Sequence, residues 1–300
     1  MRKYVLTLLL ILVFAGALYI YYSYITPHEE RKPGIVQGEP ESYAGKLRLA
    51  SWNLRVFSDE SRDDEKLRTI VNNLNNYDFV AIIELRDEPV LNRTRAMLKT
   101  MGRDFDYEIS DEVGWNVKER YAFLYDVSKV KVTKPGQIFP DRSDSFIREP
   151  YYGSFQAGKF DFTVIATHVI WGNKVSERRR EIKKLAEVYE QIQDMDREEQ
   201  DIILVGDFNR EPDDEQAFKK LRDIPSMINL FNLPDKTIIF DSNLYDNIWF
   251  QSKYVKEYTG VSGINRFDES DFGNNDEKAS LIVSDHRPVW AEFNTTRDDD

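Results

Sequence analysis

Five apolar runs of the sequence end on side chains that could bind a metal ion or move a proton. These ends are Asn53, Glu84, His168, the segment Gly206-Asp207-Phe208-Asn209 and the segment Ser284-Asp285-His286. One such residue alone is commonly a turn former or a cap. Five together predict a shared site, because a sheet fixes the backbone where its strand ends meet solvent.

The residue types at these ends define the chemistry. The chain has no cysteine, which excludes disulfides, zinc-thiolate sites and thiol nucleophiles. Carboxylate and amide oxygens suit Mg²⁺, with Ca²⁺ or Mn²⁺ as alternatives. His168 and His286 are candidates for proton transfer near neutral pH. Each needs an orienting carboxylate, and Glu119 and Asp246 are the unclaimed carboxylates near strand segments.

The elements that must position these residues are short strands alternating with helices. Apolar periodicity predicts helices near 67–74 and over 89–101 and 175–194. Strands are predicted over 47–53, 78–84, 120–126, 146–156, 160–167, 201–205, 245–250, 278–283 and 289–293. The consecutive strands between 120 and 167 favour packed mixed sheets covered by helices over a purely parallel sheet. We therefore expect one mixed α/β domain.

The N-terminus carries a separate signal. An uncharged, mostly apolar run extends from Tyr4 to Ile25 after Arg2 and Lys3, and its length of roughly 33 Å as a helix suffices to cross a bilayer core. This predicts a transmembrane anchor over 1–26, with the domain on the extracytoplasmic side. The alternative is a cleaved signal peptide and a secreted protein. Segment 27–46 is predicted to be a linker, and 295–300 a polar tail.

The charge balance limits the possible partners. The 300 residues contain 53 Asp and Glu against 41 Lys and Arg, a net charge of −12, and 41% are hydrophobic. This composition predicts a globular core and excludes a partner held by bulk positive charge. A polyanionic substrate would need divalent cations or local basic contacts.

Seven motifs, in this order, resemble the endonuclease/exonuclease/phosphatase superfamily. They are Ser51-Trp52-Asn53-Leu54-Arg55, Ile83-Glu84-Leu85-Arg86-Asp87, Lys118-Glu119-Arg120-Tyr121, Ala166-Thr167-His168, Gly206-Asp207-Phe208-Asn209, Tyr245-Asp246 and Ser284-Asp285-His286-Arg287-Pro288-Val289. Segments 118–125 and 144–150 resemble its deoxyribonuclease I-like branch. The resemblance implies a four-layer α-β-β-α sandwich (α+β) with two mixed β-sheets, forming a single domain over 47–294.

The resemblance also implies roles for individual residues. Glu84 would be the principal ligand of a catalytic divalent cation, assisted by Asn53 and Asp285. The implied catalytic residues are two oriented histidines and two residues that position water or phosphate: His168 with Glu119, His286 with Asp246, and Asp207 with Asn209.

Substrate contacts follow the same resemblance but with departures. Arg86 matches the arginine that this branch inserts into the minor groove, where an arginine is a plausible DNA contact, and Arg120 is a second implied contact. The tyrosine that precedes the Lys-Glu-Arg-Tyr segment in the branch is Val117 here, with Trp115 nearby. The family's disulfide is absent.

The implied activity is metal-dependent phosphodiester hydrolysis by a deoxyribonuclease I-like endonuclease, acting as a monomer on DNA or RNA. The predicted anchor supports an alternative, a membrane-associated phosphodiesterase or phosphatase of the same superfamily that resembles sphingomyelinases or inositol-phosphate phosphatases. A catalytically inactive binding module is disfavoured because every matched position retains a competent side chain.

One basic stretch is left without a role. Arg178, Arg179, Arg180, Lys183 and Lys184 lie near the start of the long predicted helix. Such a run is usually a solvated helix face, and the alternative is a contact with phosphate or lipid headgroups.

Overall fold

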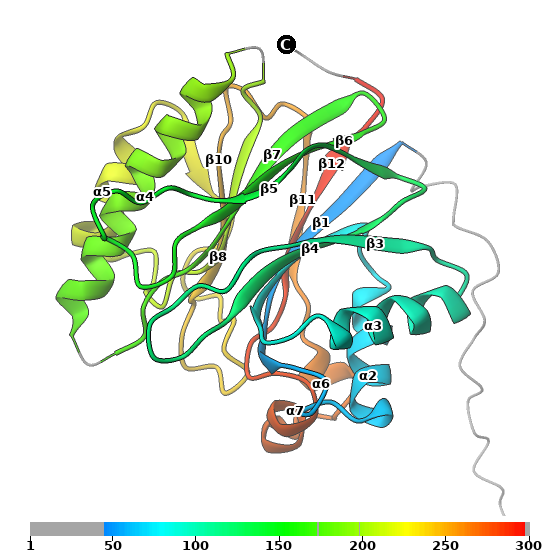
Figure 1. Ribbon diagram of the computed structural model, residues 1–300. Helices are drawn as coiled ribbons and strands as arrows, with labels where there is room; N and C mark the ends of the chain where they lie inside the picture. The colour runs from blue at the N-terminus through cyan, green and yellow to red at the C-terminus, as the bar shows by residue number, and fades with distance from the viewer. Residues whose placement is uncertain (1–44, 173, 198, 298–300) are drawn as a thin grey trace, which may run out of the picture. The chain divides into compact units, whose positions relative to one another are not determined.

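Two β-sheets lie face to face in the computed structural model, with helices on both outer faces (Figure 1). The structure describes residues 45–172, 174–197 and 199–297. The predicted anchor and nearly all of the predicted linker lie outside the described residues. Among the helices that are described, none has the length and apolar character needed to span a bilayer.

The first sheet has the strand order β11-β12-β1-β2-β4-β3. Its strands are β1 (Lys46–Phe57), β2 (Phe79–Leu85), β3 (Phe105–Ile109), β4 (Arg120–Asp126), β11 (Tyr258–Ile264) and β12 (Val289–Asn294). β1 pairs in parallel with β2, and the other neighbours that the structure describes pair antiparallel.

The second sheet has the order β5-β6-β7-β8-β10-β9. Its strands are β5 (Val130–Ile138), β6 (Tyr151–Ala157), β7 (Phe160–His168), β8 (Ile202–Asp207), β9 (Met227–Asn229) and β10 (Asp246–Gln251). β7 and β8 are parallel, so this sheet is also mixed. The expected pair of mixed sheets is confirmed.

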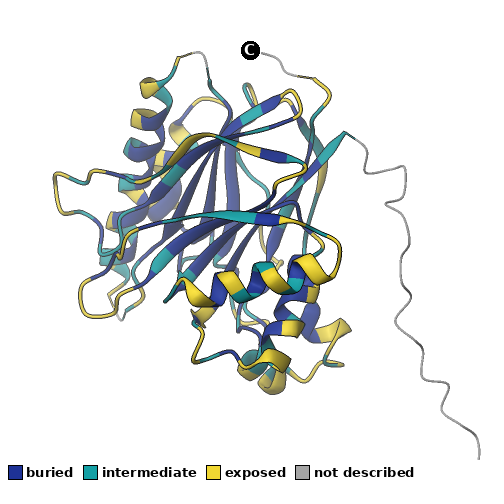
Figure 2. Ribbon diagram, turned by 45° about the vertical axis from the view of Figure 1, so that its right-hand side comes forward, coloured by how far each residue is buried: buried dark blue, intermediate teal, exposed yellow. Residues whose placement is uncertain are grey.

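Three apolar layers hold the sandwich together. Phe79, Phe123 and Phe155 belong to the core between the sheets. Helices α2 (Asp64–Leu74), α3 (Pro89–Thr100), α6 (Phe267–Ser270) and α7 (Asp276–Ile282) contribute to a second core on β1 and β2. Helices α4 (Val175–Met195) and α5 (Glu215–Asp223) pack on the second sheet. Burial is concentrated in the strands, while the helices expose their outer sides (Figure 2). The four-layer arrangement matches the expected fold.

Two strand predictions are wrong in part or in full. Residues 278–283 were predicted as a strand, but Asp276–Ile282 form helix α7. Ala279 and Val283, four residues apart, are buried there, whereas Leu281 is 74% exposed, and this spacing is helical. The strand predicted over 146–156 begins only at Tyr151, because the preceding residues form a loop whose backbone bonds to the Asp141 carboxylate.

Several elements escape the sequence patterns. The unpredicted elements are β3, β5, β9, β11, α5 and α6. β5 contains Pro135 and Gly136 and is largely solvent-exposed, so its sequence carries little of the apolar alternation that marks a strand. β9 has only three residues. The pairing of these short or exposed strands is decided by the neighbouring strands rather than by their own residues.

Candidate active site

Five of the predicted site residues continue the strand faces that line the core between the sheets. Successive side chains of a strand point to opposite faces. In β7, Val164 and Ala166 are followed on the inner face by His168, and in β8, Val205 is followed by Asp207. The same spacing places three more side chains at the polar end of this core, namely Asn53, Glu119 and Asp246.

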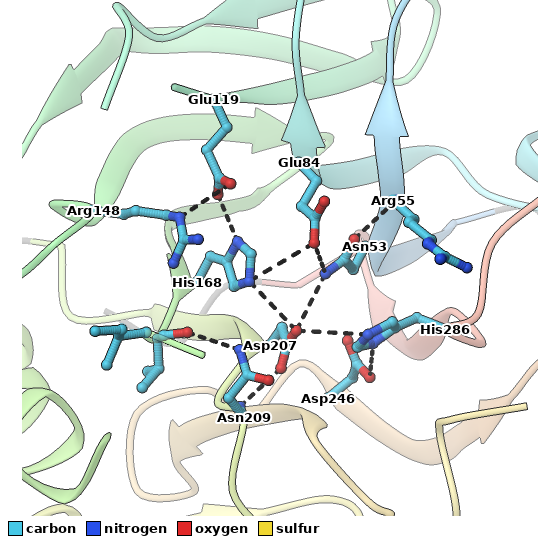
Figure 3. Close-up of polar contacts among 12 residues, drawn as sticks. Asn53, Arg55, Glu84, Glu119, Arg148, His168, Asp207, Asn209, Asp246 and His286 are labelled. Atoms are coloured by element: carbon cyan, nitrogen blue, oxygen red, sulfur yellow. Dashed lines mark hydrogen bonds and ion pairs between the residues drawn. The ribbon is translucent and has the colours of Figure 1, made fainter. Parts of the chain in front are cut away.

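Glu84 reaches the same place by a different route. Ile83 lies in the core between the sheets and Ile82 in the outer core, so regular alternation would point Glu84 toward the helices. The pairing of β2 with β4 shifts register between Ile82 and Leu85, and Glu84 has a φ of 63°. A bulge of this kind re-aims a side chain, and the Glu84 carboxylate consequently faces the cleft (Figure 3).

His168 is held by Glu119. Its Nδ1 lies 2.5 Å from Glu119 Oε1, and the backbone N–H of His168 donates to the Tyr121 hydroxyl. Arg148 Nε lies 3.0 Å from the second Glu119 oxygen. Glu119 is thus shared between a histidine and an arginine (Figure 3), and its position fixes the imidazole with Nε2 toward the cleft.

His286 forms the second histidine–carboxylate pair. Its Nδ1 lies 2.8 Å from Asp246 Oδ2. Asp246 is fully buried and its other carboxylate oxygen has no hydrogen-bond partner among the described residues. His286 follows helix α7 rather than a strand, and its backbone N–H donates to Ser284 Oγ. The loop before β12 therefore supplies this residue.

Asp207 lies between the two pairs. Its Oδ2 is 3.7 Å from His168 Nε2 and also 3.7 Å from His286 Nε2. The side-chain nitrogen of Asn53 donates to the same Asp207 oxygen at 3.2 Å and to Glu84 Oε1 at 3.1 Å. Asn53 therefore links the carboxylates of Asp207 and Glu84 (Figure 3).

Burial and mutual charge shift the titration of these groups. Burial lowers the pKa of His286, but the carboxylates of Asp246 and Asp207 outweigh it and raise the pKa to about 10. Burial likewise opposes protonation of His168, and Glu119 raises its pKa above the usual value. Burial raises the pKa of Asp207. Burial acts in the same direction on Glu84, but the charge of His168 and the Asn53 hydrogen bond lower the pKa of Glu84 overall.

Asn209 occupies the turn after β8. It has a φ of 48°, and its side-chain nitrogen donates to the carbonyl of Val169, the residue after His168. Its backbone N–H donates to Asp207 Oδ1. These bonds tie the ends of β7 and β8 together and leave the Asn209 side chain in the lining of the cleft.

The remaining predicted residues divide into two groups. Arg86 lines the cleft, 3.4 Å from Glu84, and Asp285 lines it while paired with Arg55 at 3.4 Å. Arg120 does not line the cleft, because its guanidinium bonds to the Ser110 carbonyl and lies 3.6 Å from Glu112. The implied substrate role of Arg120 therefore has no support from its position.

The cleft also contains residues to which the sequence assigned no role. It encloses about 440 Å³ and is lined in addition by Arg55, Arg148, Trp171 and Tyr245. Trp171 is 62% exposed, and the buried guanidinium of Arg178 lies 5.4 Å from its ring. A signal for Arg148 was present in the matched segment 144–150, whereas an isolated tryptophan after His168 carries none.

The donor set fits a hard divalent cation. Glu84 and Asp207 offer carboxylate oxygens on either side of Asn53, and the cleft contains no sulfur donor. Asp207, Asp246 and His286 form another group whose ligand atoms lie within 4.8 Å of one another. There, however, His286 and Asp246 already bond to each other. Glu84 Oε1 lies 3.9 Å from His168 Nε2, farther than Asp246 lies from His286, and this looser contact favours the Glu84 side, although the Asn53 oxygen accepts from the Arg55 backbone.

Comparison with known proteins agrees with this geometry. Residues 50–254 match the Endonuclease/Exonuclease/phosphatase family. The chain is 28% identical to a deoxyribonuclease of Thioalkalivibrio sp. (strain K90mix) over 277 residues, which cover 86% of this chain and 74% of that protein. It is 29% identical to deoxyribonuclease-1 of Equus caballus over 265 residues, 81% of this chain and 90% of the relative.

Solved structures share the fold at lower identity. D. rerio TDP2, solved with a single-strand DNA product, superposes with a TM-score of 0.57 at 16% identity, over 83% of this chain and 99% of that chain. The family match covers more than half of the sequence, and the curated relatives span nearly the whole described domain. This chain therefore belongs to the Endonuclease/Exonuclease/phosphatase family, and its similarity to deoxyribonucleases supports an enzyme of the nuclease or phosphodiesterase type.

Proposed function

We propose that this protein is a metal-dependent endonuclease that hydrolyses DNA. One observation carries the proposal: two histidines, each held at Nδ1 by a buried carboxylate, direct Nε2 toward the same oxygen of Asp207 at 3.7 Å. Two oriented imidazoles that flank one centre provide a base and an acid for a single displacement.

The proton movements in the proposed reaction balance. Water adds to phosphorus while the bond to the 3′ oxygen breaks. Nε2 of one histidine accepts the water proton, and Nε2 of the other donates a proton to the leaving oxygen. The products are a 5′ phosphate and a 3′ hydroxyl, and the two histidines regain their protonation states by exchange with solvent.

The carboxylates orient these imidazoles and stabilise their charged forms. Glu119 and Asp246 hold Nδ1 of the two rings, which leaves Nε2 free to exchange protons. Asp207 and Asn209 would orient the attacking water or the phosphate. Glu84, assisted by Asp207, would hold a divalent cation, which supplies charge stabilisation to the phosphate oxygens when it is bound.

Nucleic acid as the substrate is supported by the cleft and by the relatives. Arg55, Arg86 and Arg148 line the cleft, so this chain with a net charge of −12 has local basic contacts beside the carboxylates that would hold a divalent cation. The relatives from Thioalkalivibrio and Equus caballus are named deoxyribonucleases. We propose that the enzyme acts as a monomer, because all residues of the proposed mechanism come from one chain.

Plasmid nicking tests the proposal directly. Supercoiled DNA is incubated with the purified protein in Mg²⁺, in Ca²⁺, in Mn²⁺ and in excess chelator. We expect nicked and then linear DNA with a metal ion, and intact DNA with chelator. Parallel reactions with RNA and with sphingomyelin vesicles separate the alternatives. Hydrolysis of sphingomyelin with intact plasmid would contradict the proposal and favour the membrane-lipid branch.

We also propose that residues 1–26 anchor the enzyme in a membrane with its catalytic domain on the extracytoplasmic side. The support is the uncharged run from Tyr4 to Ile25 and its basic flank. Fractionation of cells, followed by protease treatment of intact cells or spheroplasts, tests it. Recovery of a shortened chain in the soluble secreted fraction would instead indicate a cleaved signal peptide.

A further inference from the structure

A basic groove lies on the outer side of α4. It encloses about 330 Å³ and is lined by Ser145, Ser176, Arg180, Lys183, Lys184, Glu187 and Lys220. Four cations and one carboxylate give this groove a net charge of about +3 at neutral pH. The lining comes from three segments: the loop before β6, helix α4 and helix α5.

Helical spacing brings these side chains together. Ser176, Arg180, Lys183 and Glu187 follow one another at intervals of three or four residues, and Lys184 lies four residues after Arg180 and three before Glu187, which places all five on one face of α4. Lys184 and Lys220 are partly neutralised, since both pair with Glu187, at 2.7 Å and 3.1 Å. The groove therefore has a paired half and an unpaired half.

Arg180 and Lys183 form the unpaired half. Among the residues that the structure describes, neither has an ion-pair partner, and both side chains are exposed. A merely solvated helix face in this acidic protein has many carboxylates available for pairing. Two unpaired cations in a concave lining with two serine hydroxyls instead match the donors that bind phosphate oxygens.

The groove adjoins the catalytic cleft. Ser145 lines the groove and Arg148 lines the cleft, and three residues of chain span at most about 10 Å. Between them, the Ile147 N–H donates to Glu181, the neighbour of Arg180. Ten ångströms is about the rise of three nucleotides along a DNA strand. A strand bound in the cleft can therefore reach the groove.

We propose that this basic groove is a second phosphate-binding site, which holds the backbone of a nucleic acid strand beyond the scissile phosphate. The proposal rests on the proposed nuclease function. Arg180 and Lys183 would contact backbone phosphates without reading sequence, since neither side chain lines the cleft. The groove would therefore act on affinity for long substrates and leave the chemical step unchanged.

The test is the salt dependence of DNA binding. Full-length protein carrying His286→Ala, which slows cleavage, is titrated with a fluorescein-labelled duplex of about three helical turns at several salt concentrations in Mg²⁺. Each phosphate contact contributes about 0.9 to the slope of log K against log salt. We expect the Arg180→Gln/Lys183→Gln double variant to reduce the magnitude of this slope by about 1.8. The Arg180→Lys/Lys183→Arg variant, which keeps both positive charges, should retain the original slope.

A matched control removes the same charge elsewhere. Lys131 is the second residue of β5, Lys159 precedes β7 at the opposite end of that strand from His168, and both side chains are exposed. Lys131→Gln/Lys159→Gln should leave the slope unchanged. In the otherwise active chain, the groove variant should raise KM for duplex DNA several-fold, while hydrolysis of bis(p-nitrophenyl) phosphate keeps its wild-type rate.

Three outcomes would overturn the proposal, and they differ from one another. If the wild-type chain cuts DNA and the His286→Ala chain binds it, an unchanged slope in the groove variant rules out the groove as a phosphate site but leaves the nuclease function. Loss of binding to phosphatidylserine vesicles, with an unchanged DNA slope, assigns the groove to a membrane surface. If the wild-type chain hydrolyses bis(p-nitrophenyl) phosphate but neither binds nor cuts DNA, the proposed DNA substrate is overturned, and this phosphate-binding site with it.

Discussion

The cleft and the basic groove place charge in opposite ways. In the cleft, acidic groups and histidines are buried and bonded to one another, as for Glu119 with His168 and Asp246 with His286. In the groove, Arg180 and Lys183 are exposed. Burial fixes the protonation and orientation of a group, because every charge must be matched by a neighbour. An exposed charged group only attracts opposite charges in solution, and salt screens that attraction.

This difference predicts which substitutions change chemistry and which change affinity. Removal of a buried cleft group should lower turnover strongly, because its neighbours are left uncompensated. Removal of an exposed group should change binding modestly. The substitutions below test that contrast, in order of decreasing expected effect.

Glu84→Gln should have the largest effect. It keeps the size of the side chain but removes the charge proposed to hold the divalent cation, so we expect a loss of DNA cleavage of about 10³-fold or more, since metal activation supplies several kcal/mol. The measurement is the rate of plasmid nicking as Mg²⁺ is increased. Glu60→Gln, an exposed carboxylate outside the cleft, is the control. Equal activity in both variants would contradict the metal role of Glu84.

His168→Ala and His286→Ala should come next. Each removes a general acid or base, and we expect turnover to fall about 10²-fold or more. Steady-state kcat on duplex DNA is the measurement, and circular dichroism establishes that the variants fold. Asp246→Asn should produce a smaller loss, since it keeps a group beside His286 but not its charge. Near-full activity of both purified histidine variants would rule out the mechanism.

Asp126 extends the contrast to stability. This buried aspartate accepts hydrogen bonds from Ser128 and from Arg103. Burial raises its pKa, but these bonds outweigh burial and lower it overall. The stabilisation is therefore present above the unfolded pKa of about 3.9 and is lost as pH falls through the lower folded pKa.

The corresponding variant is Asp126→Asn. We expect it to destabilise the fold by about 2 kcal/mol near neutral pH, because a charged acceptor of buried donors is removed, and to converge with wild type at acid pH. Urea unfolding across pH measures this. Asp223→Asn removes an exposed carboxylate paired with Lys219 and should change stability by about 0.5 kcal/mol at most. Identical losses in the two variants would contradict the contrast.

Trp171→Ala should have the smallest effect on activity. Trp171 lies on the wall of the cleft, and the loss of one stacking platform should raise KM for DNA about fivefold, at the low end of base–aromatic stacking. Trp115 has the same 62% exposure but does not line the cleft, so Trp115→Ala is a matched control. A comparable rise in KM for Trp115→Ala would assign the effect to general surface loss.

Much of the site could be predicted from the sequence because its residues obey the strand period. Asn53, His168 and Asp207 end apolar runs whose inner faces are regular, so their meeting at one edge of the sandwich follows from their pattern. His286 was attributed to a strand end, although helix α7 precedes it. The order of motifs singled out this residue, and the structure places it beside Asp246 and Asp207, whereas the periodicity assigned the wrong element before it.

Other features could not be predicted because they depend on contacts distant in sequence. The short and exposed strands β5 and β9 form through pairing with β6 and β10. Arg148 acquires its position only when the loop before β6 crosses the end of β4 and meets Glu119. Arg120 has a suitable side chain in a matched motif, yet the pairing of β4 with β3 directs it to Ser110 and Glu112.

The sequence by itself determined the family, the donor chemistry and the mixed sheets, since residue types and strand alternation are local properties. Only the tertiary structure decided which charged groups lie close enough to interact. The register shift that turns Glu84 into the cleft arises from the pairing of β2 with β4 within the first sheet, and the common approach of two histidines to Asp207 arises from the packing of the two sheets. So does the division between the acidic cleft and the basic groove, because burial, which sets the strength of each charge, exists only once the chain has folded.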